Sequence, residues 1–285
     1  MNETRGVLRR MRYLALVLAA CTGLAAIDAF LIEPRWLKVS RITITSRKVQ
    51  DPVRLVLVAD VQTDRPGRYE ARAFKKVMAE RPDLILFAGD YIHLGPRSRS
   101  YEAEARALRD LMIEAGLSAP LGVYAVAGNI DRHNGWRVAF DGVPAVLVDA
   151  TTRYDLGPVA LTALGVEHSF RAEAVVPATA AGSDVVNDRF HIVLGHSPNF
   201  SLGEVEADLL LAGHTHGGQV QLPLIGPLVT LSAVPRAWAS GVTEIAPGKT
   251  LIVSRGVGME RGHAPRVRFL CRPEIVVVDL VPEQQ

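Results

Sequence analysis

Two histidines that directly follow an aliphatic run are the residues of this chain best suited to chemistry. The segment 209–219 reads LLLAGHTHGGQ, so His214 and His216 stand one residue apart after a run typical of a buried strand. The glycines let the backbone turn and come close to a ligand at the end of that strand. Histidine is the commonest metal ligand. The segment therefore favours a metal site over a structural loop, although a His-x-His in a loop can also be incidental.

Four further aliphatic runs end in side chains that can bind metals. The runs VRLVLVAD, DLILFAGD, GVYAVAGN and HIVLGH end at Asp60, Asp90, Asn129 and His196. In open α/β sheets, ligands bind beyond the carboxyl ends of the strands. We therefore expect these strand ends to converge on one crevice. Each residue taken alone could be an ordinary polar residue that ends a strand, but the repetition favours a shared site.

The composition excludes several other classes of function. A chain of 285 residues with 48% hydrophobic and 22% charged residues fits one large globular domain with an appendage. The net charge of +2 and the aromatic content of 6% offer neither a basic surplus nor many stacking platforms, so we do not expect a nucleic-acid partner. Cys21 and Cys271 lie far apart in the sequence and indicate neither a disulfide framework nor a cysteine zinc site.

The N-terminal segment differs from the rest of the chain. An arginine cluster is followed by an apolar stretch from Tyr13 to about Ile32, which is interrupted only by Asp28. This length suits a single membrane-spanning helix. We therefore predict an anchor over residues 1–33, a connector over residues 34–50 and the main domain over residues 51–285. The arginines of the cluster are Arg5, Arg9, Arg10 and Arg12.

Two other interpretations of this segment stay open. The residues before Cys21 look like a lipoprotein processing box, but the apolar character continues past Cys21 and favours the anchor. The pair Arg9-Arg10 fits a twin-arginine export signal as well as the flank of an anchor. Basic residues lie on both sides of the stretch, so the positive-inside rule does not decide cleanly. We expect a single-pass protein of the cell membrane with its main domain outside the cytoplasm.

Strands and helices alternate in the first half of the main domain. The pattern predicts strands at 53–59, 83–88 and 121–127, helices near 70–80 and 101–115, and a helical turn after His133. An extended segment at 40–45 could start the sheet, and 171–187 is either a helix or an irregular surface excursion. Later strands are expected near 145–148, 152–155, 159–164, 190–195, 208–212, 218–222, 228–232, 250–254, 267–271 and 274–280. Because the late strands follow one another closely, we predict a mixed two-sheet core covered by helices.

The polar residues at these strand ends also stand in a familiar order. Over roughly residues 50 to 282 the chain resembles the calcineurin-like metallophosphoesterase superfamily. The GHTHGGQ box and the late segment SRGVGMERGHAPRVRFLCRPEI resemble its membrane-anchored bacterial branch of YkuE- and YaeI-like phosphodiesterases. The resemblance implies an α/β fold in the form of a four-layer α/β/β/α sandwich. It also implies a dinuclear metal centre that cleaves a phosphodiester or pyrophosphate bond with a metal-activated hydroxide.

The same resemblance implies a division of ligands between the two metals. Asp60 and His216 would bind the first metal, and Asp90 would bridge both. The second metal would be bound by Asn129, His196 and His214, and Asn129 would also take part in catalysis. Carboxylate, amide and imidazole ligands together suit Mn²⁺, Zn²⁺ or Fe.

Gln62 is the first departure from the superfamily pattern, which usually has histidine there. The carbonyl oxygen of an amide is an ordinary ligand for hard ions. Gln62 as a ligand would therefore favour Mn²⁺ or Mg²⁺ over Zn²⁺. The alternative is that Gln62 does not bind metal.

Ile130 is the second departure, because the superfamily has a histidine there that contacts the phosphate and protonates the leaving group. Loss of a general acid typically costs on the order of 10²- to 10⁴-fold in rate. His133 could replace the missing acid, although His133 and His93 are more typical of solvated loop histidines. Otherwise the substrate has a good leaving group, or the protein is a metal-binding pseudoenzyme with reduced activity. Asp131 is expected to serve structure.

Arg255 is a candidate for binding the substrate. It follows a predicted strand in Ser254-Arg255-Gly256, where its guanidinium could contact a phosphate in two places, or it could be a surface arginine. The predicted partner is a small-molecule or lipid-linked phosphoester, and attachment to a membrane favours the latter. A plain membrane-anchored structural domain is the remaining alternative.

Overall fold

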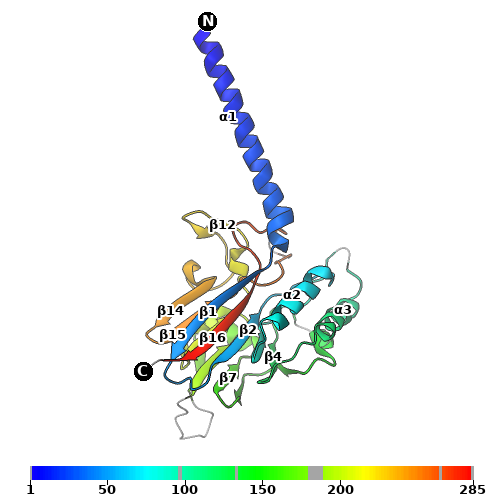
Figure 1. Cartoon of the computed structure of the whole chain (residues 1–285), viewed down its shortest axis with the longest axis vertical. Coiled ribbons are helices and arrows are strands. Elements are labelled where there is room, and N and C mark those ends of the chain that lie inside the picture. The colour runs from blue at the N-terminus through cyan, green and yellow to red at the C-terminus, as the bar shows by residue number, and fades with distance from the viewer. Residues whose placement is uncertain (1, 96–97, 132–133, 179–188, 263–264, 284–285) are drawn as a thin grey trace.

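The fold is built on two six-stranded mixed sheets, with a long N-terminal helix that projects from them (Figure 1). The computed structural model describes residues 2–95, 98–131, 134–178, 189–262 and 265–283. The projecting helix is α1 (Asn2–Ile27). His133 lies outside the described residues, as does most of the later part of the segment 171–187.

The first sheet has the strand order β1-β16-β2-β3-β4-β5. Most adjacent strands of this sheet are parallel, whereas β16 is antiparallel to β2. The predicted extended segment at 40–45 is part of β1, which pairs with β16 along its whole length. The strands are β1 (Lys38–Ser46), β16 (Glu274–Pro282), β2 (Val53–Val58), β3 (Leu84–Phe87), β4 (Val123–Val126) and β5 (Ala145–Val148).

The second sheet has the strand order β14-β15-β11-β9-β7-β6. Two short strand pairs lie outside both sheets: β8 (Val175–Val176) with β10 (Glu204–Val205), and β12 (Gln221–Leu222) with β13 (Gly226–Pro227). The strands of the second sheet are β14 (Gly241–Ala246), β15 (Lys249–Val253), β11 (Leu209–Ala212), β9 (Phe190–Leu194), β7 (Val159–Ala163) and β6 (Thr152–Asp155).

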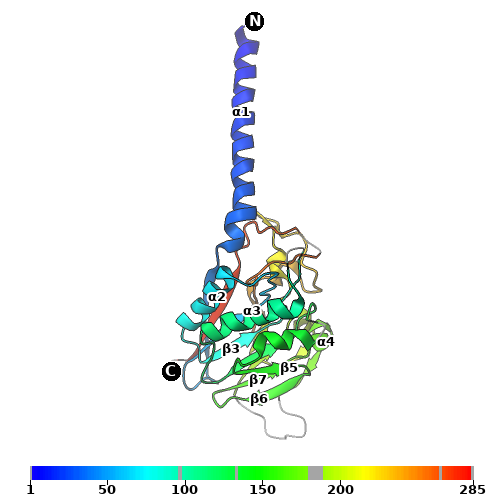
Figure 2. The same cartoon turned by 90° about the vertical axis from the view of Figure 1, so that its right-hand side faces the viewer.

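The alternation of side chains along buried strands explains the layers. Leu55 and Leu57 of β2 face the core between the sheets, whereas Val56 and Val58 face the helices on the other side. That outer face is covered by α2 (Arg68–Ala79), α3 (Tyr101–Glu114) and the 3₁₀ helix η3 (Asn134–Phe140), as Figure 2 shows for α2 and α3.

The outer face of the second sheet is covered by shorter pieces. They include α4 (Val166–Phe170) and the 3₁₀ helices η4 (Pro198–Leu202) and η6 (Arg236–Trp238). Phe200 of η4 is part of the buried apolar cluster on this face, and Trp238 of η6 packs against that cluster. The predicted sandwich of two mixed sheets flanked by helices is therefore confirmed.

The register places the carboxyl ends of the central strands beside the root of α1. Lys38, which opens β1, pairs with Glu274, and Leu57 near the end of β2 pairs with Val276 of the same strand β16. Because β3 and β4 run parallel to β2, their carboxyl ends lie at this end of the molecule too. The polar residues that follow these strands are therefore gathered at the end from which α1 leaves (Figure 1).

Two expected strands are absent, and one observed strand was not predicted. Residues 228–232 and 267–271 do not form strands, and only an isolated bridge joins Val220 to Phe269. Leu231 and Leu270 have positive φ angles of 50° and 52°, which interrupt an extended backbone. The edge strand β14 was not predicted, because its side chains alternate between half-buried and exposed and give no continuous apolar run.

The predicted anchor segment forms one long helix with a fastened base. Residues Gly6–Arg35 are long and apolar enough to cross a membrane. After α1 the chain continues through a π-helical turn, η1 (Asp28–Ile32), and a 3₁₀ turn, η2 (Glu33–Arg35). The buried carboxylate of Glu33 accepts hydrogen bonds from the backbone N–H groups of Leu270 (2.9 Å) and Cys271. These bonds tie the base of the helix to a loop of the domain.

Candidate metal centre

Residues from both sheets meet at one buried point. His196, after β9, has its Nε2 atom 3.6 Å from Oδ2 of Asp90, after β3, and its Nδ1 atom 3.9 Å from Oδ1 of Asp60, after β2. Ligand atoms of Asp90, His196 and His214 all lie within 4.8 Å of one another. The structure therefore brings together side chains that are up to 154 residues apart in the sequence.

The hydrogen bonds of His196 leave a set of lone pairs facing one another. Its Nδ1 donates to the carbonyl oxygen of Ala88 at 2.6 Å, so the Nε2 atom of the neutral ring is an acceptor. This Nε2 faces Oδ1 of Asn129 at 2.9 Å and the carboxylate of Asp90 at 3.6 Å. Acceptor atoms arranged in this way are suited to a cation between them, and an imidazole oriented through its second nitrogen is the usual arrangement at a metal.

His216 and Gln62 provide a second, independent sign of a ligand. Both ring nitrogens of His216 and the Oε1 atom of Gln62 are buried and have no hydrogen-bond partner among the described residues. A buried polar atom without a partner costs about 1–3 kcal/mol. Gln62 uses its Nε2 instead, which donates to Glu260 at 3.0 Å and to Asp90 at 3.4 Å. Its carbonyl oxygen is thereby left available, which fits the prediction that Gln62 is a ligand.

The backbone at the predicted ligands is held in an uncommon conformation. A positive φ in a residue other than glycine costs on the order of 1–3 kcal/mol and is concentrated at functional sites. The rest of the fold must stabilise this arrangement. The φ angles are 48° at Asp60, 38° at Gln62, 58° at Asp90, 69° at His214 and 49° at His216.

Burial sets the protonation of the site. It raises the pKa of Asp60, with a further contribution from the nearby Asp90, and it raises the pKa of Asp90 itself. Burial also lowers the pKa of His196 and of His214 to about 4, and it lowers the pKa of His216 well below its ordinary value. The imidazoles are therefore neutral, and their nitrogen lone pairs can bind a metal. A bound cation would stabilise the ionised form of the carboxylates and lower their pKa. The donor set thus fits divalent ions.

Backbone donors position the two aspartates. The backbone N–H of His214 donates to both carboxylate oxygens of Asp60 at 3.0 Å. The backbone N–H of Ile130 donates to Oδ1 of Asp90 at 3.0 Å. Ile130 therefore supports a predicted ligand through its backbone, while its side chain has no proton to give.

Asp131 holds the loops of the site together, as expected of a structural residue. Its Oδ2 accepts hydrogen bonds from the N–H groups of Asp90 (2.7 Å) and Gly128 (2.8 Å), and its Oδ1 accepts one from Tyr91 (3.1 Å). These three donors lie in the two loops that carry Asp90 and Asn129. Asp131 thereby fixes the distance between those loops.

Three contributors were not predicted. Phe170, at the end of α4, lies between the predicted strand 159–164 and the segment 171–187, where no element was predicted, and its ring packs 4.8 Å from His214 and 5.9 Å from His196 between centroids. Glu260 binds Gln62, and the fully buried Arg268 donates to the carbonyl oxygen of Cys271 at 2.9 Å and to that of Gly258. Glu260 and Arg268 stand in the late segment that resembles the superfamily, and that resemblance is the one signal in the sequence that pointed to them.

Arg255 and His93 were the other candidates named from the sequence. The guanidinium of Arg255 lies 3.3 Å from the carboxylate of Glu274, which also accepts the backbone N–H of Arg255 at 3.0 Å. Contact between Arg255 and a substrate phosphate stays a prediction. His93 is half-buried rather than solvated.

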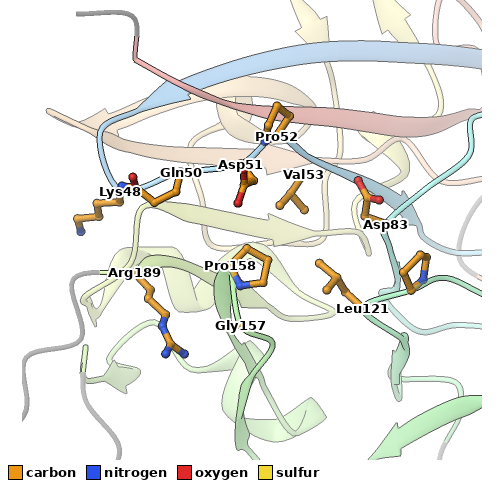
Figure 3. Close-up of a pocket in the computed structure, with 11 residues that line it drawn as sticks. Lys48, Gln50, Asp51, Pro52, Val53, Asp83, Leu121, Gly157, Pro158 and Arg189 are labelled. Carbon is orange, nitrogen blue, oxygen red and sulfur yellow. The ribbon is translucent and has the colours of Figure 1, made fainter.

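A pocket at the opposite end of the strands is separate from this centre (Figure 3). It is lined by Val53, which opens β2, and by Asp83, Leu121, Pro158 and Arg189, which precede β3, β4, β7 and β9. Because strand ends that carry the predicted ligands lie at the other edge of the sheets, this pocket cannot be the metal centre.

Comparison with known proteins points to one family of phosphoesterases. Residues 53–218 match the family model described as calcineurin-like phosphoesterase. The chain is 34% identical over 211 residues to the uncharacterized metallophosphoesterase YkuE of Bacillus subtilis, covering 70% of this chain and 68% of YkuE. It is 27% identical to the phosphodiesterase YaeI of Escherichia coli, covering 87% and 90%. It is 24% identical to the UDP-2,3-diacylglucosamine pyrophosphatase LpxG of Chlamydia muridarum, again covering 87% and 90%.

Proposed function

This chain belongs to the calcineurin-like phosphoesterase family and is a hydrolase acting on phosphoester bonds, and we propose that it cleaves a phosphodiester or pyrophosphate bond of a lipid-linked substrate. The observation that carries the proposal is the set of facing acceptors around His196, together with the orphaned ring of His216. Such a set is unfavourable without cations and suited to holding them.

The proposed ligands can hold two divalent ions, of which Mn²⁺ suits the carboxylate and amide oxygens best. When bound, such ions supply the Lewis acidity that activates water and neutralises the charge on the attacked phosphorus. The chain contributes the fixed positions of the ligands through the buried bonds of Asp131, His214 and Ala88. The proposed ligands are Asp60, Gln62, Asp90, Asn129, His196, His214 and His216.

Ile130 limits the substrates that this site can turn over. Its side chain cannot protonate a departing oxygen, so the leaving group must depart as a stable anion. Phosphate groups and activated alcohols satisfy this condition, whereas simple alkoxides do not. A pyrophosphate or activated diester therefore fits the site better than an unactivated alkyl ester.

The position of α1 supports the lipid-linked part of the proposal. The apolar helix leaves the domain at the edge where the predicted ligands lie, so a helix embedded in a membrane would hold the centre near the lipid surface. One relative, LpxG, is named for a diacylated sugar nucleotide. We infer that the domain lies outside the cytoplasm, with the arginines at 5–12 in the first half of α1 on the cytoplasmic side, and protease treatment of intact cells tests that orientation.

Hydrolysis by the purified full chain in detergent tests the proposal. With Mn²⁺ present, we expect turnover of an activated phosphodiester and of a lipid-linked pyrophosphate, and little turnover of an unactivated alkyl phosphate. The matched control is Asp90→Asn, which keeps the shape of the side chain and removes its charge. If the wild-type chain turns over none of these substrates, or if Asp90→Asn is as active as wild type, the proposal is wrong.

A metal-binding pseudoenzyme is the second candidate, and Ile130 is the residue that favours it. In that case metal would bind while hydrolysis stayed at the level of the Asp90→Asn control. The two candidates therefore differ in activity and agree in metal content.

A further inference from the structure

The hairpin formed by β12 and β13 exposes an unusual amount of apolar surface beside the base of α1. Figures 1 and 2 both place this hairpin and the loop after it at the end of the domain from which α1 leaves. Leu224 at its tip is fully exposed, at 108%, and Ile225 and Val229 are each 61% exposed. Leu228 and Leu231 are about half exposed, at 48% and 57%. Exposed apolar residues gathered in one place mark an interaction site.

The sequence of the hairpin gives no reason for this exposure in water. No Asp, Glu, Lys or Arg lies between Asp208 and Arg236. Leu224 and Leu231 also have positive φ angles, of 67° and 50°, where glycine or asparagine would be less strained. Leucines at strained, exposed turn positions are unfavourable for folding in water. They are explained if the hairpin contacts an apolar medium.

Backbone hydrogen bonds connect the hairpin to the base of α1. The N–H of Arg268 donates to the carbonyl oxygen of Ala29, in the turn that follows α1, at 3.0 Å. The next residue, Phe269, donates to Gln219 and accepts from Gln221, each at 2.9 Å. The hairpin therefore has a fixed position relative to the point where the apolar helix leaves the domain.

The base of the N-terminal helix carries residues that are typical of a membrane interface. Trp36 is 56% exposed just after the helical turns, and the guanidinium of Arg272 stacks on its ring at 3.9 Å from the centroid. Arg35 is exposed beside it. Tryptophan and arginine are enriched at the level of the lipid headgroups, where cations also meet anionic lipids.

We propose that the hairpin tip and the loop after the hairpin insert into the membrane that α1 crosses and form a second contact with its lipid. The inserted residues are those at 223–225, together with Leu228, Val229 and Leu231. The contact would hold the mouth of the metal centre against the bilayer, because Nε2 of His214 lies 3.1 Å from the carbonyl oxygen of Leu231. The inference rests on the proposed anchoring of α1 and does not depend on which bond is hydrolysed.

Depth-dependent quenching in liposomes tests this contact on the full chain. Cys21 is replaced by alanine, and Cys271 is buried, so that a single introduced cysteine can be labelled with the fluorophore NBD. The label is placed by Leu224→Cys in one protein and by Ile225→Cys in a second, because Ile225 is not at a positive φ. The control is Gln50→Cys, an exposed position beside the pocket at the far end of the domain.

We expect the label at 224 and at 225 to shift to the blue and to lose fluorescence in liposomes that contain doxyl-labelled lipid. The label at 50 should show neither change. If the chain stays in the liposomes after carbonate washing but both hairpin labels behave like the label at 50, the hairpin inference is wrong and the anchor stands. If carbonate releases the chain, the anchor itself is wrong. A blue shift of the hairpin labels that increases with protein concentration, without quenching by the doxyl-labelled lipid, would mean contact between copies of the chain. That result would also overturn the inference.

Discussion

Replacement of Asp131 tests whether the buried bonds of this carboxylate position the metal centre. In Asp131→Asn, the side-chain oxygen can keep both bonds of Oδ2, to the N–H groups of Asp90 and Gly128. The amide NH₂ then points at the N–H of Tyr91, where Oδ1 now accepts at 3.1 Å. One bond is lost, and the N–H of Tyr91 and the new amide NH₂ are both left without an acceptor. In Asp131→Ala all three bonds are lost.

The magnitudes follow from the number of bonds and from the cost of burying the charge. Burial raises the pKa of Asp131, so desolvation offsets part of each bond, and the lower end of the range for bonds to charged groups applies. At about 1.5 kcal/mol per bond, Asp131→Asn should lower the free energy of unfolding by about 1.5–3 kcal/mol, and Asp131→Ala by about 4–5 kcal/mol. Misplacement of Asp90 and Asn129 should also weaken Mn²⁺ binding by about 10- to 100-fold.

Urea unfolding of the full chain in detergent, followed by tryptophan fluorescence, measures the first effect. Trp136 is a local reporter, because it stacks on Tyr91 with centroids 5.5 Å apart. Asp110→Asn is the matched control, since that side chain is 63% exposed and its loss should change stability by less than about 0.5 kcal/mol. The reasoning is refuted if Asp131→Asn unfolds and binds Mn²⁺ like wild type.

Three further predictions follow from other parts of the chain. In Gly213→Ala the new methyl group would lie 2.6 Å from Oδ2 of Asp60, so we expect loss of Mn²⁺ binding with a folded domain, measured by titration calorimetry; unchanged affinity would contradict the placement of Asp60. Ile130→His should raise turnover of substrates with poor leaving groups by about 10²- to 10⁴-fold and change activated substrates little. An equal gain on both kinds of substrate would show that the histidine acts otherwise than as an acid. Burial lowers the pKa of His191 to about 4 from its ordinary 6.5. As the pH falls, the unfolded chain therefore binds a proton at this histidine at a higher pH than the folded chain does. The free energy of unfolding should fall by up to about 3 kcal/mol as the pH drops from 6.5 to 4. His191→Gln should flatten this decline in unfolding experiments, and parallel curves for the two proteins would disprove the assignment.

The strands that carry the predicted ligands could be predicted because they are buried on both faces. The runs before Asp60, Asp90 and His196 are continuous and aliphatic, and each lies within one or two residues of the observed strand. Convergence of the residues that follow then depends on a general property of sheets, that carboxyl ends gather at one edge. The sequence alone was sufficient for this part of the site.

Other features depend on tertiary contacts that leave no local pattern. The apolar run at 228–232 predicts a strand, yet Val229 and Leu231 are exposed and the chain turns there. The positive φ angles of the ligands and the bond from Glu260 to Gln62 also have no signature in the spacing of residues. Periodicity reports burial against a core, and it cannot distinguish a buried strand from a surface loop that is apolar for another reason.

The metal content of the purified full chain tests the central claim most directly. After dialysis against Mn²⁺ at neutral pH, elemental analysis should find two ions per chain in wild type, as expected for a two-metal hydrolase. It should find fewer in His216→Phe, whose ring keeps its volume but offers no nitrogen, and fewer still in Asp90→Ala. A wild-type chain that binds no divalent ion, or variants that bind as many as wild type, would contradict the account.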